Sequence, residues 1–301
     1  MTVDTLLIPT DGSDPAEAAA ARGFDLAAQL QASVHVLSVA DSSVATGAGY
    51  AGDSASIRSR LRERASARAT ALQADAEERG LDATAAVREG IPANEIVGYA
   101  DEHGIDGIVI GTAGRSGITR ALVGSVADKV VRTATVPVVT ITPEAATETT
   151  STIESILCPT DGSESATTAT HHSLSVADQL EAAVHFLSVI DSDLGDRVVA
   201  LTNDDGDPLS GLHERAETHL ETLASHGQER NFEVETATRN GEPAEEIVAY
   251  ADTDGIDLIA MGTAGRGGFE RALVGSVTDT VIRTASVPVL TVRPDEPHDD
   301  S

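Results

Sequence analysis

Short apolar runs alternate along the chain with longer segments in which apolar residues recur every three or four positions. The short runs predict buried strands of a parallel sheet, and the longer segments predict amphipathic helices that cover it. In the first half the predicted strands are 4–9, 33–39, 82–88, 105–110 and 136–141. The predicted helices are 13–31, 54–79, 92–103 and 124–134. This alternation predicts an α/β fold, an open and doubly wound parallel sheet with helices on both faces.

The same pattern returns about 150 residues later. Residues 9–13, Pro-Thr-Asp-Gly-Ser, recur at 159–163, and the stretch 90–143 matches 241–294 at about two thirds of its positions. Solenoid repeats are much shorter, roughly 20–50 residues, so the repeat indicates a duplicated domain. The predicted organisation is a first domain, a polar linker, a second domain and an acidic tail, at residues 1–143, 144–152, 153–295 and 296–301.

The composition limits the classes of partner. The formal net charge is −29, and Lys129 is the single lysine among 20 basic residues. Such acidity, with arginine in place of lysine, is typical of proteins from a salt-rich cytoplasm, where salt screens the repulsion. With no basic stripe for nucleic acid and no apolar run of membrane-spanning length, neither partner is expected. We expect a cytoplasmic protein without a signal peptide. Cys158, aligned with Ile8, is expected to be a small core residue.

Two loops that follow strands carry the candidate chemistry. One is the loop after the first strand, which contains Asp11, with Asp161 as its copy. The other follows the fourth strand and reads G-x2-G-x9-G-S, from Gly111 to Ser125 and again from Gly262 to Ser276. Glycines let backbone N–H groups turn toward an anion, and a helix N-terminus adds its positive dipole end. If the two strands are neighbours at the switch in strand order, the carboxylate can accept from ribose while the glycine loop holds phosphates.

Other chemistry finds little support in the sequence. Asp11 alone, before Gly-Ser, would as often be a turn residue. The nine histidines form no metal-binding pattern, and His213, His219 and His226 are expected to have structural or solvated roles. Neither a Ser-His-Asp arrangement nor a Gly-Lys-Ser/Thr phosphate loop occurs. We therefore predict no catalytic residue and no metal ligand.

The repeated glycine loop and strand-one aspartate resemble the ATP-binding branch of the universal stress protein family, and the acidity resembles its haloarchaeal members. The resemblance implies a Rossmann-like fold of the adenine nucleotide alpha hydrolase type in both halves, with strand order 3-2-1-4-5. It implies ATP or AMP as the ligand, with Mg²⁺ as a further candidate, and an unknown protein partner. Family members pair through strand five, so we expect such pairing within one chain or in a homodimer.

The resemblance also carries the family's site residues onto this chain. In the first half they are Pro9, Thr10, Asp11, Val39, Gly111, Gly114, Arg115, Gly124, Ser125 and Val126. In the second half they are Pro159, Thr160, Asp161, Val189, Gly262, Gly265, Arg266, Gly275, Ser276 and Val277. One departure is Ala113, with Ala264, where many members have histidine.

The leading functional hypothesis is an ATP-binding regulatory or stress-response protein, with slow ATP hydrolysis still open. The alternatives are a dedicated ATPase or nucleotidyl-transfer enzyme, and an interaction module without nucleotide. Residues 111–132 carry a net charge of +3, against +1 for 262–283. The loops after the second strands carry −2 at 41–55 and −5 at 191–211. We therefore expect the first site to bind a triphosphate better, by about 1 kcal/mol or less; the alternative is two equivalent sites.

Overall fold

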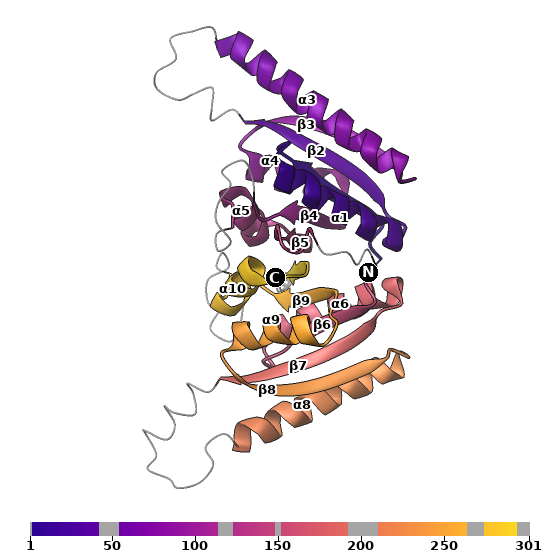
Figure 1. Cartoon of the computed structure of the whole chain (residues 1–301), viewed down its shortest axis with the longest axis vertical. Coiled ribbons are helices and arrows are strands. Elements are labelled where there is room, and N and C mark those ends of the chain that lie inside the picture. The colour runs from indigo at the N-terminus through magenta and orange to yellow at the C-terminus, as the bar shows by residue number, and fades with distance from the viewer. Residues whose placement is uncertain are drawn as a thin grey trace, which may run out of the picture. The chain divides into compact units, whose positions relative to one another are not determined.

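The structure, a computed structural model, describes residues 2–41, 54–113, 123–147, 152–191, 210–263 and 274–293. The chain divides into two compact units, Thr2–Thr152 and Ile153–Ser301 (Figure 1). The loops 42–53 and 192–209, the middle of each glycine loop and the acidic tail lie outside the described residues.

The first unit is a parallel five-stranded sheet with the order β3-β2-β1-β4-β5. Its strands are β1 (Thr5–Thr10), β2 (Ser33–Asp41), β3 (Ala83–Gly90), β4 (Gly107–Gly111) and β5 (Val138–Ile141). Its helices are α1 (Asp14–Leu30), α3 (Ser54–Glu78), α4 (Pro92–His103) and α5 (Ser125–Thr133). This order is 3-2-1-4-5, so the predicted fold class is confirmed for this unit.

The second unit repeats the arrangement with the order β8-β7-β6-β9-β10, which again corresponds to 3-2-1-4-5. Its strands are β6 (Ser155–Pro159), β7 (Ala183–Asp191), β8 (Val234–Gly241), β9 (Leu258–Gly262) and β10 (Val289–Val292). Its helices are α6 (Glu164–Leu180), α8 (Ser210–Glu229), α9 (Pro243–Thr253) and α10 (Ser276–Thr284).

The core of each unit lies between the sheet and its two helical layers. All four residues of β5 and of β10 are buried, as expected for parallel strands covered on both faces. Right-handed crossovers place α1 and α3 on one face of the first sheet and α4 and α5 on the other. The inner stripe of α3 is mostly alanine (Ala65, Ala69, Leu72 and Ala76), which lets this otherwise arginine-rich helix lie close to β2 and β3.

An aspartate directly before the fourth strand ties this strand to the first strand at the amino end of each sheet. Asp106 Oδ2 accepts hydrogen bonds from the backbone N–H groups of Asp4 (3.0 Å) and Thr5 (2.9 Å). Asp257 does the same for Glu154 (2.9 Å) and Ser155 (3.0 Å). These contacts fix the first and fourth strands to each other at their amino ends.

The polar segment after β5 begins with structure that the sequence did not predict. Residues 143–147 form a turn in which Ala145 is fully buried and its N–H donates to Thr142 Oγ1 at 3.0 Å. The predicted linker is therefore ordered at its start, because Thr142 supplies a side-chain acceptor for the turn.

Candidate functional site

The candidate site lies where the strand order reverses, between β1 and β4 in the first unit. These strands are parallel neighbours, with Leu6 opposite Gly107 and Leu7 opposite Ile108. The following helices, α1 and α5, leave toward opposite faces of the sheet, and such a switch point opens a crevice at the carboxyl ends of the strands. β6 and β9 have the same relation in the second unit, with Ile156 opposite Leu258.

The glycine that ends the fourth strand lies against the first helix. A Cβ on Gly111 would lie 3.1 Å from Ala19 Cβ and 3.4 Å from the carbonyl oxygen of Pro15, both on α1. A Cβ on Gly262 would lie 2.7 Å from the carbonyl oxygen of Ser165 on α6. The first motif glycine therefore allows the close approach of a helix, and so brings the loops after the first and fourth strands together.

Both ends of the glycine loop are held at the carboxyl end of the fourth strand. Thr112 N donates to the carbonyl of Ile141 at 2.9 Å, and Gly124 N donates to the carbonyl of Thr112 at 2.7 Å. In the second unit Thr263 N donates to Val292 at 2.9 Å, and Gly275 N donates to Thr263 at 2.8 Å. The predicted site residues between these ends lie outside the described residues: Gly114, Arg115, Gly265 and Arg266.

These contacts refine the role predicted for the last motif glycine. The N–H of Gly124 is engaged by Thr112, so the donors left for an anion are the first-turn amides of α5, at Ser125, Val126 and Ala127. First-turn amides have no acceptor within their own helix and form its positive end. Ser125 is exposed and Val126 is half-buried, and Ser276 and Val277 repeat this exposure in α10. The start of each helix can therefore contact a phosphate.

The charges on these two helices are partly cancelled within each helix. Arg132 Nε lies 3.0 Å from both carboxylate oxygens of Asp128. Arg283 pairs with Asp279 in the same way, with contacts of 2.9 Å. Among the described residues of α5 and α10, the difference in net charge between the two helices is therefore due to Lys129. The aligned residue in the second half is Thr280.

The strand-one loop holds its aspartate with local hydrogen bonds. Thr10 is buried, and its Oγ1 accepts from Gly12 N at 2.9 Å. Asp11 Oδ1 accepts from Ser13 N at 3.0 Å and from Ser13 Oγ at 2.6 Å. Ser13 stands at the N-cap of α1, but its side chain makes no capping hydrogen bond, because the hydroxyl donates to Asp11 instead. The Asp11 carboxylate is thereby held in a defined orientation in the loop after β1.

The second unit arranges the same loop sequence differently. Thr160 Oγ1 accepts from Gly162 N at 3.2 Å, and Asp161 Oδ1 accepts from Ser163 N at 2.9 Å. The Ser163 hydroxyl, however, accepts from Ala166 N at 3.2 Å and so caps α6. Asp161 is exposed, whereas Asp11 is half-buried. Identical residues thus give two different settings for the carboxylate.

The second strand extends beyond the first at the carboxyl end. β1 ends at Thr10 opposite Ser38, while β2 continues to Asp41 and pairs there with β3. Among the described residues, the backbone of Val39 therefore has a strand partner on its β3 side but not on its β1 side. A backbone edge of this kind can bind the polar edge of a base. Val189 stands at the matching place in β7.

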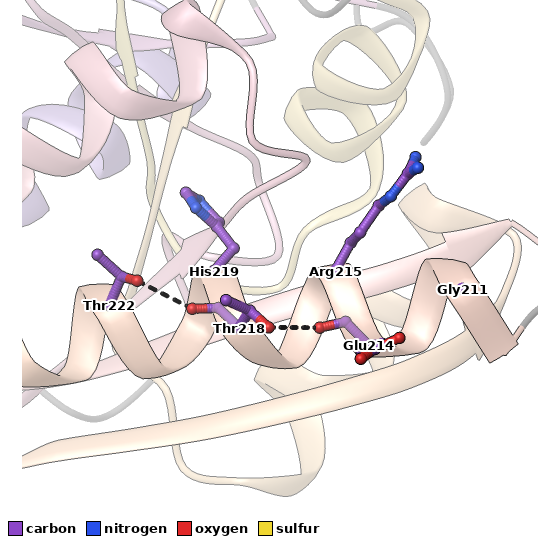
Figure 2. Close-up of a pocket in the computed structure, with 6 residues that line it drawn as sticks. All are labelled: Gly211, Glu214, Arg215, Thr218, His219 and Thr222. Carbon is purple, nitrogen blue, oxygen red and sulfur yellow. Dashed lines mark hydrogen bonds between the residues drawn. The ribbon is translucent and has the colours of Figure 1, made fainter.

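A residue that sequence reasoning gave no functional role contacts the loop of the second unit. A pocket of about 560 Å³ is lined by α8 residues Gly211, Glu214, Arg215, Thr218, His219 and Thr222 (Figure 2). His219 Nε2 lies 3.1 Å from Oγ1 of Thr160. The signal that could have found it is the alignment of the α3 and α8 sequences, which places His219 opposite Arg68.

The described part of the chain holds neither a metal-binding cluster nor a membrane-spanning helix. There, no group of three His, Cys, Asp or Glu side chains is placed to hold a metal ion. None of the helices in those ranges combines the length and apolarity that a membrane crossing requires.

Comparison with known proteins gives consistent matches. The model of the Universal stress protein family matches residues 2–142 and again 152–293. Universal stress protein MJ0531 of Methanocaldococcus jannaschii is 37% identical over 136 residues, which cover 45% of this chain and 80% of that protein. The crystal structure of a universal stress protein from Archaeoglobus fulgidus covers 98% of this chain and 100% of its own, with a TM-score of 0.72 and 21% identity, a likeness of fold. A universal stress protein crystallised in complex with cAMP is 20% identical over 48% of this chain and 99% of its own, with a TM-score of 0.35.

Proposed function

The chain belongs to the universal stress protein family, and we propose that each of its two units binds an adenine nucleotide, ATP or AMP, as a regulatory ligand in a stress response. The observation that carries this proposal is the start of α5 and of α10. Each helix begins with Gly-Ser and is held at the carboxyl end of the fourth strand, which is the parallel neighbour of the strand that precedes the aspartate loop. Donors for phosphate and an acceptor for ribose are the chemistry of a nucleotide site.

The residues take distinct roles in this proposal. In the first unit, the amides and hydroxyl at Ser125 and Val126 hold phosphate, Asp11 accepts from ribose hydroxyls, and the backbone at Val39 meets the adenine edge. Pro9 and Thr10 shape the strand-one loop, and Gly111, Gly114, Arg115 and Gly124 complete the glycine loop. In the second unit the same roles fall to Pro159, Thr160, Asp161, Val189, Gly262, Gly265, Arg266, Gly275, Ser276 and Val277.

The close approaches at this edge fit a backbone cradle. A Cβ on Gly124 would lie 3.3 Å from the carbonyl oxygen of Thr112, so a larger side chain would crowd the anchored end of the loop. The Asp11 carboxylate, oriented by Ser13, suits the ribose hydroxyls better than activation of a water. The arrangement therefore favours binding over turnover, and release of inorganic phosphate from ATP is the measurement that would favour the enzyme hypothesis.

A charge reversal at the helix start tests the proposal. We expect Ser125→Asp to weaken ATP binding at the first site about tenfold or more, because a carboxylate would face the phosphates. Aspartate is favourable at a helix N-terminus, so thermal stability should not fall. Ser125→Asn is the matched uncharged control, and Ser276→Asp with Ser276→Asn repeats the test in the second unit. Calorimetric titration at high salt gives the affinities.

The proposal is wrong for a unit in which the aspartate and asparagine variants bind ATP equally well. Mass spectrometry of nucleotide released from protein purified in high salt identifies the natural ligand. Pairing through strand five, within one chain or between two, stays a prediction, which sedimentation at high salt tests.

A further inference from the structure

The helix after the second strand places a basic side chain against the strand-one loop in each unit. Arg68 on α3 lies across Gly12, since a Cβ on Gly12 would lie 2.5 Å from Cδ and 2.8 Å from Nε of Arg68. His219 on α8 occupies the equivalent position and reaches Oγ1 of the buried Thr160 at 3.1 Å. The two halves thus carry an arginine and a histidine at one structural position.

A second basic residue stands one turn earlier in both helices. Figure 2 shows the side chains of Arg215 and His219 projecting from the same side of α8, and both line the pocket of about 560 Å³. Arg64 precedes Arg68 by the same four residues in α3. Two basic groups one helical turn apart, beside a loop at the carboxyl edge of the sheet, form a place for an anionic group.

We propose that position 68 in the first unit and position 219 in the second supply a cationic contact to the anionic nucleotide bound beside the strand-one loop, and that His219 makes the affinity of the second site depend on pH. This inference rests on the nucleotide binding proposed above. Arginine keeps its charge at every physiological pH, whereas histidine changes charge between about pH 5 and 8. We therefore expect the contribution of this cation to nucleotide affinity at the first site to be constant across the range, and affinity at the second site to rise as the pH falls.

The other charged groups near His219 do not reproduce this behaviour. On α8, Glu214 and Arg215 line the pocket with it, and Asp161 stands next to Thr160 in the loop after β6. Carboxylates and guanidinium groups ordinarily keep their charge between pH 5.5 and 8. Thr160 Oγ1, which accepts from Gly162 N, can donate to a neutral imidazole nitrogen or accept from a protonated one, so the contact survives in both states.

The test measures each site alone in the full chain. Ser125→Asp leaves the second site to be titrated with ATP, and Ser276→Asp leaves the first, from pH 8.0 to pH 5.5 at constant ionic strength. We expect the affinity of the second site to rise on the order of fivefold relative to the first as the pH falls. The protonation of ATP itself is common to both sites, so it cancels in the comparison.

Exchanging the arginine and the histidine between positions 68 and 219 distinguishes a role in nucleotide binding from a purely structural role. His219→Arg should remove the pH dependence and leave tight binding at pH 8.0, and Arg68→His should transfer the pH dependence to the first site. His219→Gln keeps a neutral hydrogen-bonding side chain beside Thr160 and should bind weakly at every pH. His226→Gln, an exposed position later in α8, is the control and should change nothing.

Equal pH profiles for the two sites, or a difference that persists in His219→Arg, would overturn the inference while leaving nucleotide binding intact. A loss of the difference in His226→Gln would overturn it too. Absence of ATP binding at both sites across the whole pH range would overturn the proposed function as well.

Discussion

Replacing Gly262 by alanine tests the claim that this motif glycine is required by the packing of a helix. The added Cβ would lie 2.7 Å from the carbonyl oxygen and 2.9 Å from the carbonyl carbon of Ser165, and closer still to its Oγ. These backbone atoms belong to the first turn of α6, which the Ser163 cap holds in place. Gly111 is the matched site in the first unit, where the nearest atoms lie at 3.1 and 3.4 Å.

The expected loss of folding stability follows from those distances. Overpacking a well-packed interior typically costs about 1–3 kcal/mol, and Gly262→Ala should reach the upper end because the opposing atoms are backbone. Gly111→Ala should cost about 1 kcal/mol or less, since the opposing methyl group can shift slightly and alanine restricts the unfolded chain. Hydrogen exchange read by mass spectrometry reports each unit separately. Exchange of α6 and β9 amides should accelerate about a hundredfold in Gly262→Ala.

A second substitution can refute this reasoning. Ser165→Ala removes the hydroxyl but leaves the backbone of α6 where it is, so the double variant Gly262→Ala with Ser165→Ala should remain destabilised. Full recovery in the double variant would show that a movable side chain, and not the helix backbone, sets the limit. Equal effects of Gly111→Ala and Gly262→Ala would also contradict the packing argument.

Two further predictions concern buried groups. Burial, followed by the charge of His103, lowers the pKa of His35, whose Nδ1 lies 2.9 Å from Tyr99 Oη. The unfolded state then binds more protons, so this contribution to stability is complete above about pH 6.5 and is lost as the pH falls below it. Denaturant titrations at pH 7.5 and 5.5 should show a smaller loss in His35→Gln, and an equal loss would contradict the assignment. Burial also raises the pKa of Cys158 to about 12, despite a hydrogen bond with Ser173. Ellman's reagent at pH 8 should therefore modify Cys158 only after unfolding, and rapid modification of the folded protein would be inconsistent with its buried place.

The fold could be predicted from the sequence because each helix and strand has a recognisable pattern of apolar and polar residues. The helix predicted at 92–103 has those bounds as α4, with Pro92 in its first turn and Gly104 in the left-handed conformation at its end. The strands were found from apolar runs that are buried on both faces, such as β4 and β5. The observed strand ends differ from the predicted ones by at most two residues, because ladder pairing with neighbours rather than local apolarity decides where a strand ends.

The site could be predicted only where a residue type and its spacing dictate the chemistry. Glycines before a helix start and an aspartate after a strand are such signals, so Asp11, Gly124 and Ser125 were predicted as site residues, and their roles stay predictions. The use of Gly124 N by Thr112 was not, because a contact between residues twelve apart depends on how the loop closes. His219 was missed for the same reason, because its partner Thr160 lies 59 residues away in the sequence. The spacing of the histidines along α8 indicated only that they lie on a helix.

The two halves also show that one motif can give two degrees of preorganisation. In Pro-Thr-Asp-Gly-Ser the serine hydroxyl has one proton to donate. In the first unit that proton goes to Asp11, which therefore receives two hydrogen bonds from Ser13. In the second unit the hydroxyl of Ser163 is placed to accept from Ala166 N, and Asp161 is more exposed. A carboxylate fixed before the ligand arrives loses less entropy on binding. This argument and the extra Lys129 are independent, and both favour tighter binding by the first site. If the second site binds nucleotide as proposed, its histidine should add affinity only as the pH falls, so the difference in affinity between the two sites should narrow in acid.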